Sequence, residues 1–296
     1  MKRRDFLKKT AAVSTALSFP AFFNLEGAAG DSLVVKVSGE SPYEITKRAV
    51  KELGGMGKFI SKQDVVMVKP NIAWNRSVEQ AGNTNPEVVG AVVEMVLEAG
   101  AKKVIVMDHT THKAPSSYKR SGIEAAAKKA GAEVRHADEN RLIVHDFKGR
   151  VLKRWPVFKD HLEVDKFINL PILKHHGSSV LTIAMKNLYG IIGGNRGKLH
   201  RKMGDNIADL ANGFKTHLTI VDAYRVLLRN GPTGGRLSDV ELKKTVIACA
   251  NIMEADVVAA DLFGKSPQEV PFIQAAFERK MGNMELDKIN IKSFKV

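Results

Sequence analysis

Short runs of apolar residues alternate along the chain with longer segments whose apolar positions recur at helical spacing. The runs cover residues 33–37, 64–68, 104–107, 132–136, 167–173, 218–221 and 245–249. Short, continuously apolar runs are typical of strands that are buried on both faces of a parallel sheet. Between them, helical patterns cover residues 42–53, 86–97, 122–130, 179–189, 205–213, 238–243, 254–263 and 268–281. The tail at 288–295 is expected to return as a short strand.

This alternation predicts an α/β fold with a mainly parallel sheet and helices on both faces. Residues 138–166 break the pattern, because they are polar, rich in strand-forming residues and turn around Gly149. They predict an antiparallel hairpin inserted into the fold. A single α/β domain over residues 31–296 is the simplest organisation.

The first 30 residues resemble a twin-arginine export signal, with Arg3-Arg4 followed by Phe6-Leu7-Lys8. The apolar stretch that follows is shorter and more polar than a membrane span, which needs about 20 apolar residues. Small residues at 27–30 suit a cleavage site. We therefore expect the twin-arginine translocase to export the folded protein to the periplasm or the outer face of the cytoplasmic membrane. An uncleaved anchor or a basic amphipathic helix is the alternative.

The charge of the chain is +14, and residues 31–296 keep +11 because five basic and two acidic residues precede them. A basic surface favours anionic partners. No helix-turn-helix, zinc-finger or aromatic RNA-binding pattern is present, and export argues against nucleic acid. An anionic small molecule or polymer fits better, and a basic surface with no specific partner is the alternative.

Cysteine chemistry is tightly limited, because Cys249 is the only cysteine in the chain. The chain alone can therefore hold no iron–sulfur cluster and no cysteine zinc site. Cys249 lies in an apolar run, so a buried structural thiol is expected. The identity of any cofactor stays open.

Polar residues follow several of the predicted strands, where ligands bind in open parallel sheets. Three kinds of candidate arise from them. Lysines together with helix amides favour an anion site, and imidazoles with a carboxylate suit a metal such as zinc, iron or manganese. Ordinary hydrogen-bonded histidines are the alternative to the metal site. The basic candidates are Lys69, Lys174 and Lys186, and the metal candidates are Asp108, His109, His112 and His175, with His176 as an alternative ligand.

The third candidate is a helical pattern over 182–190 that leads into a glycine-rich basic loop at 193–197. Such a loop could cradle an anion, although it matches neither the dinucleotide fingerprint nor the Walker A motif. Asp205 and Asp209 follow one helical turn apart, suited either to a metal or to capping and solvating a helix.

Several short motifs are spread along the chain: Lys69-Pro70-Asn71, Thr84-Asn85-Pro86, Lys174 with His176, residues 186–190, 207–210 and 218–223, and Asn230-Gly231-Pro232. As a set, they resemble the bacterial and archaeal family called domain of unknown function 362. The resemblance spans roughly residues 33–275. The family offers no settled catalytic residues to carry over. Some members carry a ferredoxin-like iron–sulfur domain, which implies association with redox proteins. The single cysteine of this chain weakens that implication here.

Three functions remain open. The first is an exported protein that binds or acts on an anionic small molecule, with Lys69, Asn71, Asn85, Lys174 and Asn187 as ligand-binding residues and His176, Asp222 and Lys186 as catalytic ones. The second is a non-catalytic binding or maturation partner of an envelope redox complex. The third is a metal-dependent enzyme that uses the His/Asp set. The sequence leaves the substrate, the reaction and the oligomeric state open.

Overall fold

The computed structural model describes residues 32–296, and the predicted export signal lies outside the described residues. Buried apolar strands form a central sheet in the order β12-β1-β11-β10-β7-β2-β3-β4, with β8 paired to β10 and β9 paired to β8. The strands are β1 (Leu33–Ser38), β2 (Val65–Pro70), β3 (Lys103–Asp108), β4 (Glu133–His136), β7 (Lys166–Leu170), β8 (Ile172–His176), β9 (Val180–Thr182), β10 (Leu218–Leu227), β11 (Val240–Cys249) and β12 (Asn290–Lys295).

Most neighbouring strands of this sheet run parallel, including the β7–β2–β3–β4 series and the pairs β10–β7 and β1–β12. The exceptions are β11, which is antiparallel to both β1 and β10, and β9, which is antiparallel to β8. A separate antiparallel hairpin joins β5 (Leu142–Asp146) to β6 (Arg154–Phe158). The predicted α/β fold with a mainly parallel sheet and an inserted hairpin is confirmed.

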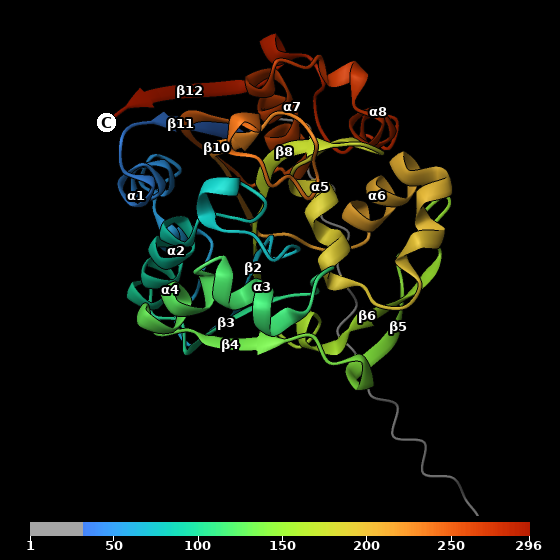
Figure 1. The fold of residues 1–296 in the computed structure, drawn as a ribbon, viewed down its shortest axis with the longest axis horizontal. Helices are drawn as coiled ribbons and strands as arrows, with labels where there is room; N and C mark the ends of the chain where they lie inside the picture. Colours follow the sequence, from blue (N-terminus) through green and yellow to red (C-terminus); the bar gives the residue numbers. More distant parts are fainter. Residues whose placement is uncertain (1–31) are drawn as a thin grey trace, which may run out of the picture. The chain divides into compact units, whose positions relative to one another are not determined.

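Helices cover both faces of the sheet and enclose two separate apolar cores. In Figure 1 most of the first group lies on the left and most of the second group on the right. The first group is α1 (Pro42–Glu52), α2 (Pro86–Glu98), α3 (Ala114–Arg120) and α4 (Ile123–Lys129). The second is α5 (Ala184–Asn187), α6 (Met203–Asn212), α7 (Ile252–Phe263) and α8 (Pro271–Phe277). Cys249 is buried in the core that contains residues of α5 to α8, and burial raises the pKa of its thiol to about 12.

Two of the predicted helices are wrong. The segment 179–189 forms strand β9 and then the short helix α5, because Val180 to Thr182 pair with β8. The segment 238–243 enters strand β11, whose first residues pair with the far end of β10. In both segments, pairing with a distant strand overrides the local helical pattern.

A buried carboxylate fixes the start of α5. Asp256 of α7 accepts hydrogen bonds from the backbone N–H groups of Ala184 (2.6 Å) and Met185 (3.0 Å). Ile183 occupies the cap position of the helix and supplies no side-chain hydrogen bond. Asp256, which is 72 residues from Ala184 in the sequence, caps the helix instead. Burial raises the pKa of Asp256 to about 8. The position of α5 therefore depends on α7.

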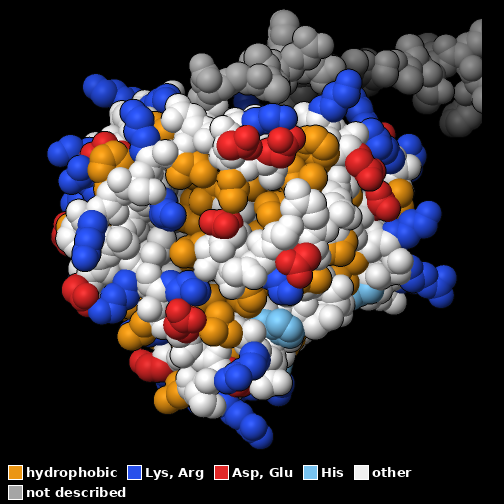
Figure 2. All heavy atoms as spheres, turned by 90° about the horizontal axis from the view of Figure 1, so that it is seen from above, with side chains coloured by type: hydrophobic (Ala, Val, Ile, Leu, Met, Phe, Trp, Pro, Cys, Tyr) orange, Lys and Arg blue, Asp and Glu red, His pale blue; other side chains and the backbone are white. Residues whose placement is uncertain are grey.

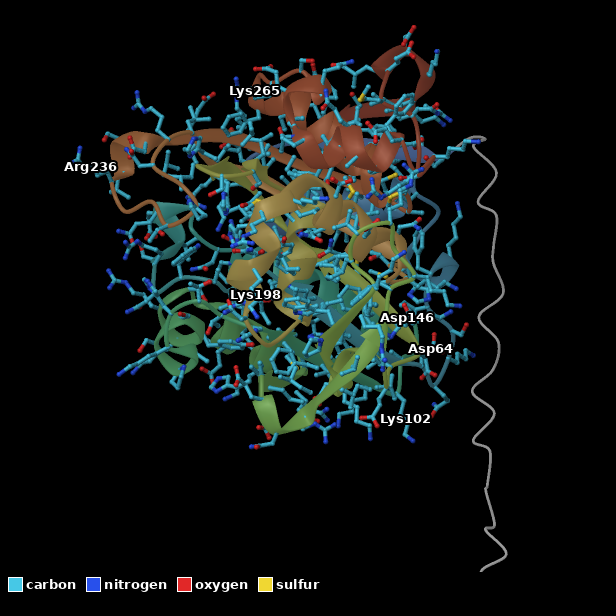
Figure 3. All side chains as sticks on the ribbon, turned by 90° about the vertical axis from the view of Figure 1, so that its right-hand side faces the viewer. Asp64, Lys102, Asp146, Lys198, Arg236 and Lys265 are labelled. Atoms are coloured by element: carbon cyan, nitrogen blue, oxygen red, sulfur yellow. The ribbon has the colours of Figure 1, made fainter. Side chains whose placement is uncertain are left out.

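Charged side chains surround the described part of the chain (Figure 3). On the face shown in Figure 2, basic side chains lie mostly around the edge, acidic ones are scattered over the edge and the middle, and apolar ones form patches in the middle. Within residues 32–296, no helix is both long and apolar enough to cross a membrane.

Replacing Asp256 by alanine is expected to lower the free energy of unfolding by about 2–4 kcal/mol, since two buried N–H groups lose their acceptor. Urea denaturation measures this loss. The control is Asp261→Ala on the same helix, where the exposed side chain predicts a change within about 0.5 kcal/mol. Equal stabilities for the two variants would contradict this role.

Candidate functional site

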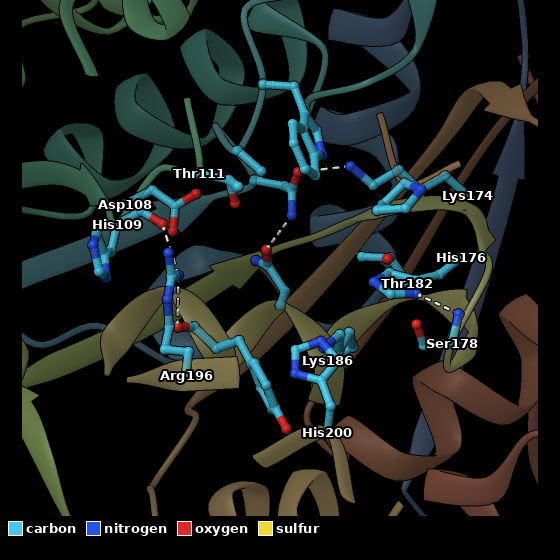
Figure 4. Close-up of a pocket in the computed structure, with 17 residues that line it drawn as sticks. Asp108, His109, Thr111, Lys174, His176, Ser178, Thr182, Lys186, Arg196 and His200 are labelled. Carbon is cyan, nitrogen blue, oxygen red and sulfur yellow. Dashed lines mark hydrogen bonds between the residues drawn. The ribbon is translucent and has the colours of Figure 1, made fainter. Parts of the chain in front are cut away.

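A cavity of about 460 Å³ opens where β2, β3 and β8 end. Figure 4 shows Asp108, His109 and Arg196 on one side of it and Lys174 and His176 on the other. The cavity is lined by Asn71, Ala73, Trp74, Asp108, His109, Thr111, Lys174, His176, Ser178, Thr182, Lys186, Asn187, Tyr189, Gly190, Arg196, His200 and Pro232. The structure thus brings together most of the strand-end residues that the sequence singles out.

A buried ion pair links the ends of β2 and β3 beside the cavity. The Lys69 ammonium lies 2.7 Å from the Asp108 carboxylate, and both side chains are almost fully buried. Asp108 also accepts the N–H of Ile72 at 2.7 Å. Burial lowers the pKa of Lys69, and the charge of Asp108 opposes that shift. The pair neutralises the one carboxylate among the lining residues.

Asn187 of α5 holds this ion pair and the neighbouring Asn71 in place. Its side-chain oxygen accepts from Lys69 (3.2 Å) and from the Asn71 amide (3.0 Å). Its own amide donates to the Lys69 carbonyl (3.3 Å) and to the Asn169 side chain (2.8 Å). A buried amide with all its hydrogen-bonding positions used is fixed in orientation. Asn187 is therefore a positioning residue.

Gly190 packs directly against the ion pair. A methyl group at this position would lie 1.8 Å from the Asp108 carboxylate oxygen and 2.6 Å from the Lys69 nitrogen. The Gly190 carbonyl accepts the N–H of His109 at 3.1 Å. The chain after α5 reaches the end of β3 only because Gly190 has no side chain.

Lys174 is a second buried lysine, and it is hydrogen-bonded without being ion-paired. Its ammonium donates to the Asn71 side-chain oxygen (3.1 Å) and to the Gly82 carbonyl (2.5 Å). Burial lowers the pKa of Lys174 to about 7, against a partial offset from Asp108. Both acceptors are neutral, so the charged form of Lys174 has no adjacent counter-ion.

Lys186 is the third buried lysine and has the fewest partners. Its side chain is 7 % exposed and lines the cavity, and no hydrogen bond or ion pair joins its amine to any residue of 32–296. The amine lies 3.6 Å from the centre of the Tyr189 ring, at cation–π distance. Burial, followed by repulsion from Arg196, lowers the pKa of Lys186 to about 7.

Arg196 adds a third cation to the cavity lining. Its guanidinium donates to the carbonyls of His109 (3.2 Å), Thr110 (3.2 Å) and Tyr189 (3.4 Å). These neutral acceptors fix its orientation without cancelling its charge. The lining therefore carries an excess of positive charge.

His176 is held as a hydrogen-bond donor toward the cavity. Its Nδ1 accepts the N–H groups of Ser178 (3.1 Å) and Ser179 (3.3 Å), which leaves the proton of the neutral ring on Nε2. Burial and the charge of Lys186 lower its pKa to about 3, so the ring is neutral at pH 7. The turn ends at Val180, whose φ of 66° is a strained value for a β-branched residue.

Three buried polar groups of the lining have neither a hydrogen-bond nor an ion-pair partner among the described residues. They are the Trp74 indole nitrogen, the Thr182 hydroxyl and the Tyr189 hydroxyl. Buried polar groups are normally satisfied, so each unsatisfied one asks for an explanation. A polar ligand in the cavity would provide hydrogen-bond partners for all three groups.

Among the predicted ligand-binding and catalytic residues, Lys69, Asn85 and Asp222 lie outside the cavity lining, and Lys69 is paired with Asp108. The side chains of Asn85 and Asp222 have other partners. Asn85 caps α2, because its side chain accepts the N–H of Glu87 at 3.0 Å. Asp222 lies inside β10 and accepts the N–H groups of Asn85 (2.7 Å) and Tyr224 (3.0 Å). Burial raises the pKa of Asp222 to about 6. Both side chains are engaged in fixing the backbone.

The structure does not gather the four metal candidates into one cluster. Asp108 forms an ion pair with Lys69, and the Nδ1 atom of His109 is hydrogen-bonded to the Ile192 carbonyl at 2.9 Å. His112 and His175 accept backbone N–H groups from other loops and do not line the cavity. Among residues 32–296, no group of three or more His, Cys, Asp or Glu side chains is placed to hold a metal ion.

Asp205 and Asp209 serve the packing of α6. Both form ion pairs with Arg279, at 2.9 Å and 2.7 Å respectively. Asp209 also accepts the N–H groups of Val151 and Leu152, which ties the hairpin connection to α6. These contacts favour the capping and packing alternative over a metal site.

Sequence reasoning missed several residues that line the cavity. Trp74, Thr182 and Tyr189 carry its unsatisfied polar groups. Thr182 and Tyr189 lie in the segment 182–190 that the sequence singles out, but neither received a role, and no motif marks Trp74. Arg196 and His200 lie in or just after the glycine-rich basic loop, which was the available signal. Asp256 lies within a buried helix and carries no signal in the sequence.

Comparisons with known proteins give a family and several distant relatives. The model of a family described as "Domain of unknown function (DUF362)" matches residues 66–261. Thylakoid-associated protein sll1697 of Synechocystis is 26% identical over 234 residues, which are 76% of this chain and 71% of that protein.

Two solved structures resemble the chain at low identity. A lactate racemase apoprotein from Thermoanaerobacterium thermosaccharolyticum has a TM-score of 0.46 at 9% identity, over 77% of this chain and 56% of that one. A protein from Thermotoga maritima has a TM-score of 0.42 at 14% identity, over 75% and 59%. The chain thus spans less than two thirds of each of these structures.

Replacing Asp108 by asparagine is expected to lower the free energy of unfolding by about 3–5 kcal/mol, because Lys69 is left buried without its counter-ion. The double variant Lys69→Met/Asp108→Asn removes both charges and is expected to recover part of that loss. Urea denaturation of the two single variants and the double variant measures the coupling. Additive losses would contradict a structural ion pair.

Replacing Gly190 by alanine is expected to destabilise the protein by at least about 2 kcal/mol, since the new methyl group overlaps the ion pair. Gly90→Ala in α2 is the control, because a methyl group there meets nothing within 4 Å. Alanine in that helix is expected to be neutral or to stabilise by up to about 1 kcal/mol. Thermal unfolding of the two variants decides the comparison.

Proposed function

We propose that this chain, which belongs to the domain of unknown function family DUF362, binds a small anionic molecule in the cavity where β2, β3 and β8 end. The observation that carries the proposal is Lys186. Its side chain is buried and lines the cavity, and no carboxylate within residues 32–296 pairs with its amine. An anionic ligand would supply the missing counter-charge.

The charges and donors of the cavity support the same ligand class. Lys174, Lys186 and Arg196 line it, whereas its one carboxylate, Asp108, is neutralised by Lys69. Nε2–H of His176 and the unsatisfied hydroxyls and indole N–H add neutral donors. Donors that surround a cation-rich cavity suit a carboxylate or a phosphate.

Among the catalytic candidates His176, Asp222 and Lys186, the geometry favours Lys186 as the side chain that exchanges protons. His176 already carries its proton on Nε2 and is hard to protonate further, so it acts as a donor and not as a base. Asp222 does not line the cavity. Lys186 has a pKa of about 7 and reaches the cavity, so it is the group suited to accept or release a proton near neutral pH.

We place the work of the protein outside the cytoplasmic membrane, as its twin-arginine pattern predicts. Arg3-Arg4 with Phe6-Leu7-Lys8 supports export of the folded chain. A cavity built by strands from distant parts of the chain exists only after folding, which suits a route that carries folded proteins. A ligand acquired before export would travel with the protein.

Binding of an anion is expected to stabilise the charged form of Lys186 and therefore to take up a proton. Affinity should fall up to about tenfold per pH unit above pH 7, because the amine must be protonated again in the complex. Titration calorimetry with acetate, oxalate and sulfate at constant ionic strength measures this, since none of these anions titrates between about pH 6 and 9.

The variant Lys186→Met is expected to weaken binding at least about tenfold and to reduce the pH dependence to the part that Lys174, with a pKa of about 7, contributes. The matched control is Lys198→Met, because Lys198 is exposed and lies outside the cavity lining (Figure 3). Circular dichroism checks that both variants fold. Unchanged affinity in the folded Lys186→Met variant would sink the proposal.

A further inference from the structure

The geometry points to covalent capture of a carbonyl group by Lys186, with a small 2-oxo carboxylate as the ligand class. This inference rests on the proposed function, because the carboxylate of the oxo acid is the anion that the cavity binds. It adds a reactive role for the Lys186 amine, which becomes the nucleophile toward the neighbouring carbonyl carbon.

The three buried lysines differ in the availability of their nitrogen. Lys69 is held in an ion pair with Asp108, and Lys174 donates hydrogen bonds to two oxygens. The Lys186 nitrogen has neither kind of partner among residues 32–296, and it lies over the Tyr189 ring at the cavity. Lys186 is therefore the buried lysine whose lone pair can reach a ligand.

Attack on a carbonyl requires the neutral amine. An ordinary lysine, with a pKa of about 10.4, is less than about 0.1% neutral at pH 7. Burial and the positive charge of Arg196 shift the Lys186 pKa to about 7, so roughly half of the amine is neutral there. A desolvated lysine beside another cation is a known arrangement for amine nucleophiles.

The capture step balances without an oxidant or reductant. The Lys186 nitrogen forms a bond to the carbonyl carbon and loses a proton, while the oxygen gains one and becomes the hydroxyl of a carbinolamine. That hydroxyl takes a second proton and leaves as water, and the product is a protonated imine. Its positive nitrogen keeps the charge that favours contact with the Tyr189 ring.

The lining offers groups for the remaining tasks. Nε2–H of His176 and the Tyr189 hydroxyl, which has no partner among the described residues, can donate hydrogen bonds to the departing oxygen, while solvent supplies its second proton. Arg196 supplies a fixed positive charge for the carboxylate. A cavity of about 460 Å³ has room for a small oxo acid with a modest side chain.

Reductive trapping tests this inference on the full folded protein. Pyruvate is the probe, and cyanoborohydride reduces an imine to a stable secondary amine. Intact mass spectrometry is expected to show one pyruvyl-derived adduct per chain, and peptide mapping is expected to place it on Lys186. Excess oxalate, which binds the same cations but has no ketone, is expected to suppress the adduct.

Two variants separate capture from anion binding. Lys186→Arg keeps a cation in the cavity but removes the nucleophile, so it is expected to lose the adduct while it still binds oxalate. Lys198→Met, the exposed control, is expected to keep both. Absence of an adduct in the wild-type protein, or an adduct spread over exposed lysines, would overturn carbonyl capture. Oxalate binding would show separately whether the anion site itself stands.

Discussion

The site depends on the buried ion pair between Lys69 and Asp108. Two opposite charges at 2.7 Å hold the ends of β2 and β3 together where water is excluded. Such a pair is tolerated only with further hydrogen bonds, which Asn187 and the N–H of Ile72 supply. Gly190 then lets α5 and its loop close over the pair. The position of Lys186, in the same short helix, follows from this contact.

Three lysines with similar burial differ because their partners differ. Lys69 has a carboxylate, Lys174 has two neutral oxygens, and Lys186 has an aromatic ring. Burial lowers the pKa of all three amines, to about 7 for Lys174 and Lys186, and only Lys69 has a carboxylate in direct contact that opposes this shift. The fold thus separates a structural lysine from two that respond to a ligand.

Local patterns in the sequence were sufficient for the α/β class, the mainly parallel sheet and the strand ends after β2, β3 and β8. They failed where distant pairing decides the outcome, as in β9 and the first half of β11. Asp222 was expected at a strand end, but β10 continues to Leu227 and leaves it inside the sheet. Asp256 had no local signal, because its partners Ala184 and Met185 lie 72 and 71 residues away.

The cavity is positively charged because the carboxylates of Asp256 and Asp108 are engaged in other contacts. Asp256 contacts the residues directly before Lys186, yet both of its oxygens accept backbone N–H groups at the start of α5. Asp108 lines the cavity, yet it is neutralised by Lys69. Had either carboxylate faced Lys186, an internal ion pair would have raised the pKa of the amine and satisfied it. Because both are engaged elsewhere, the charge state of Lys186 is left to respond to whatever anion enters.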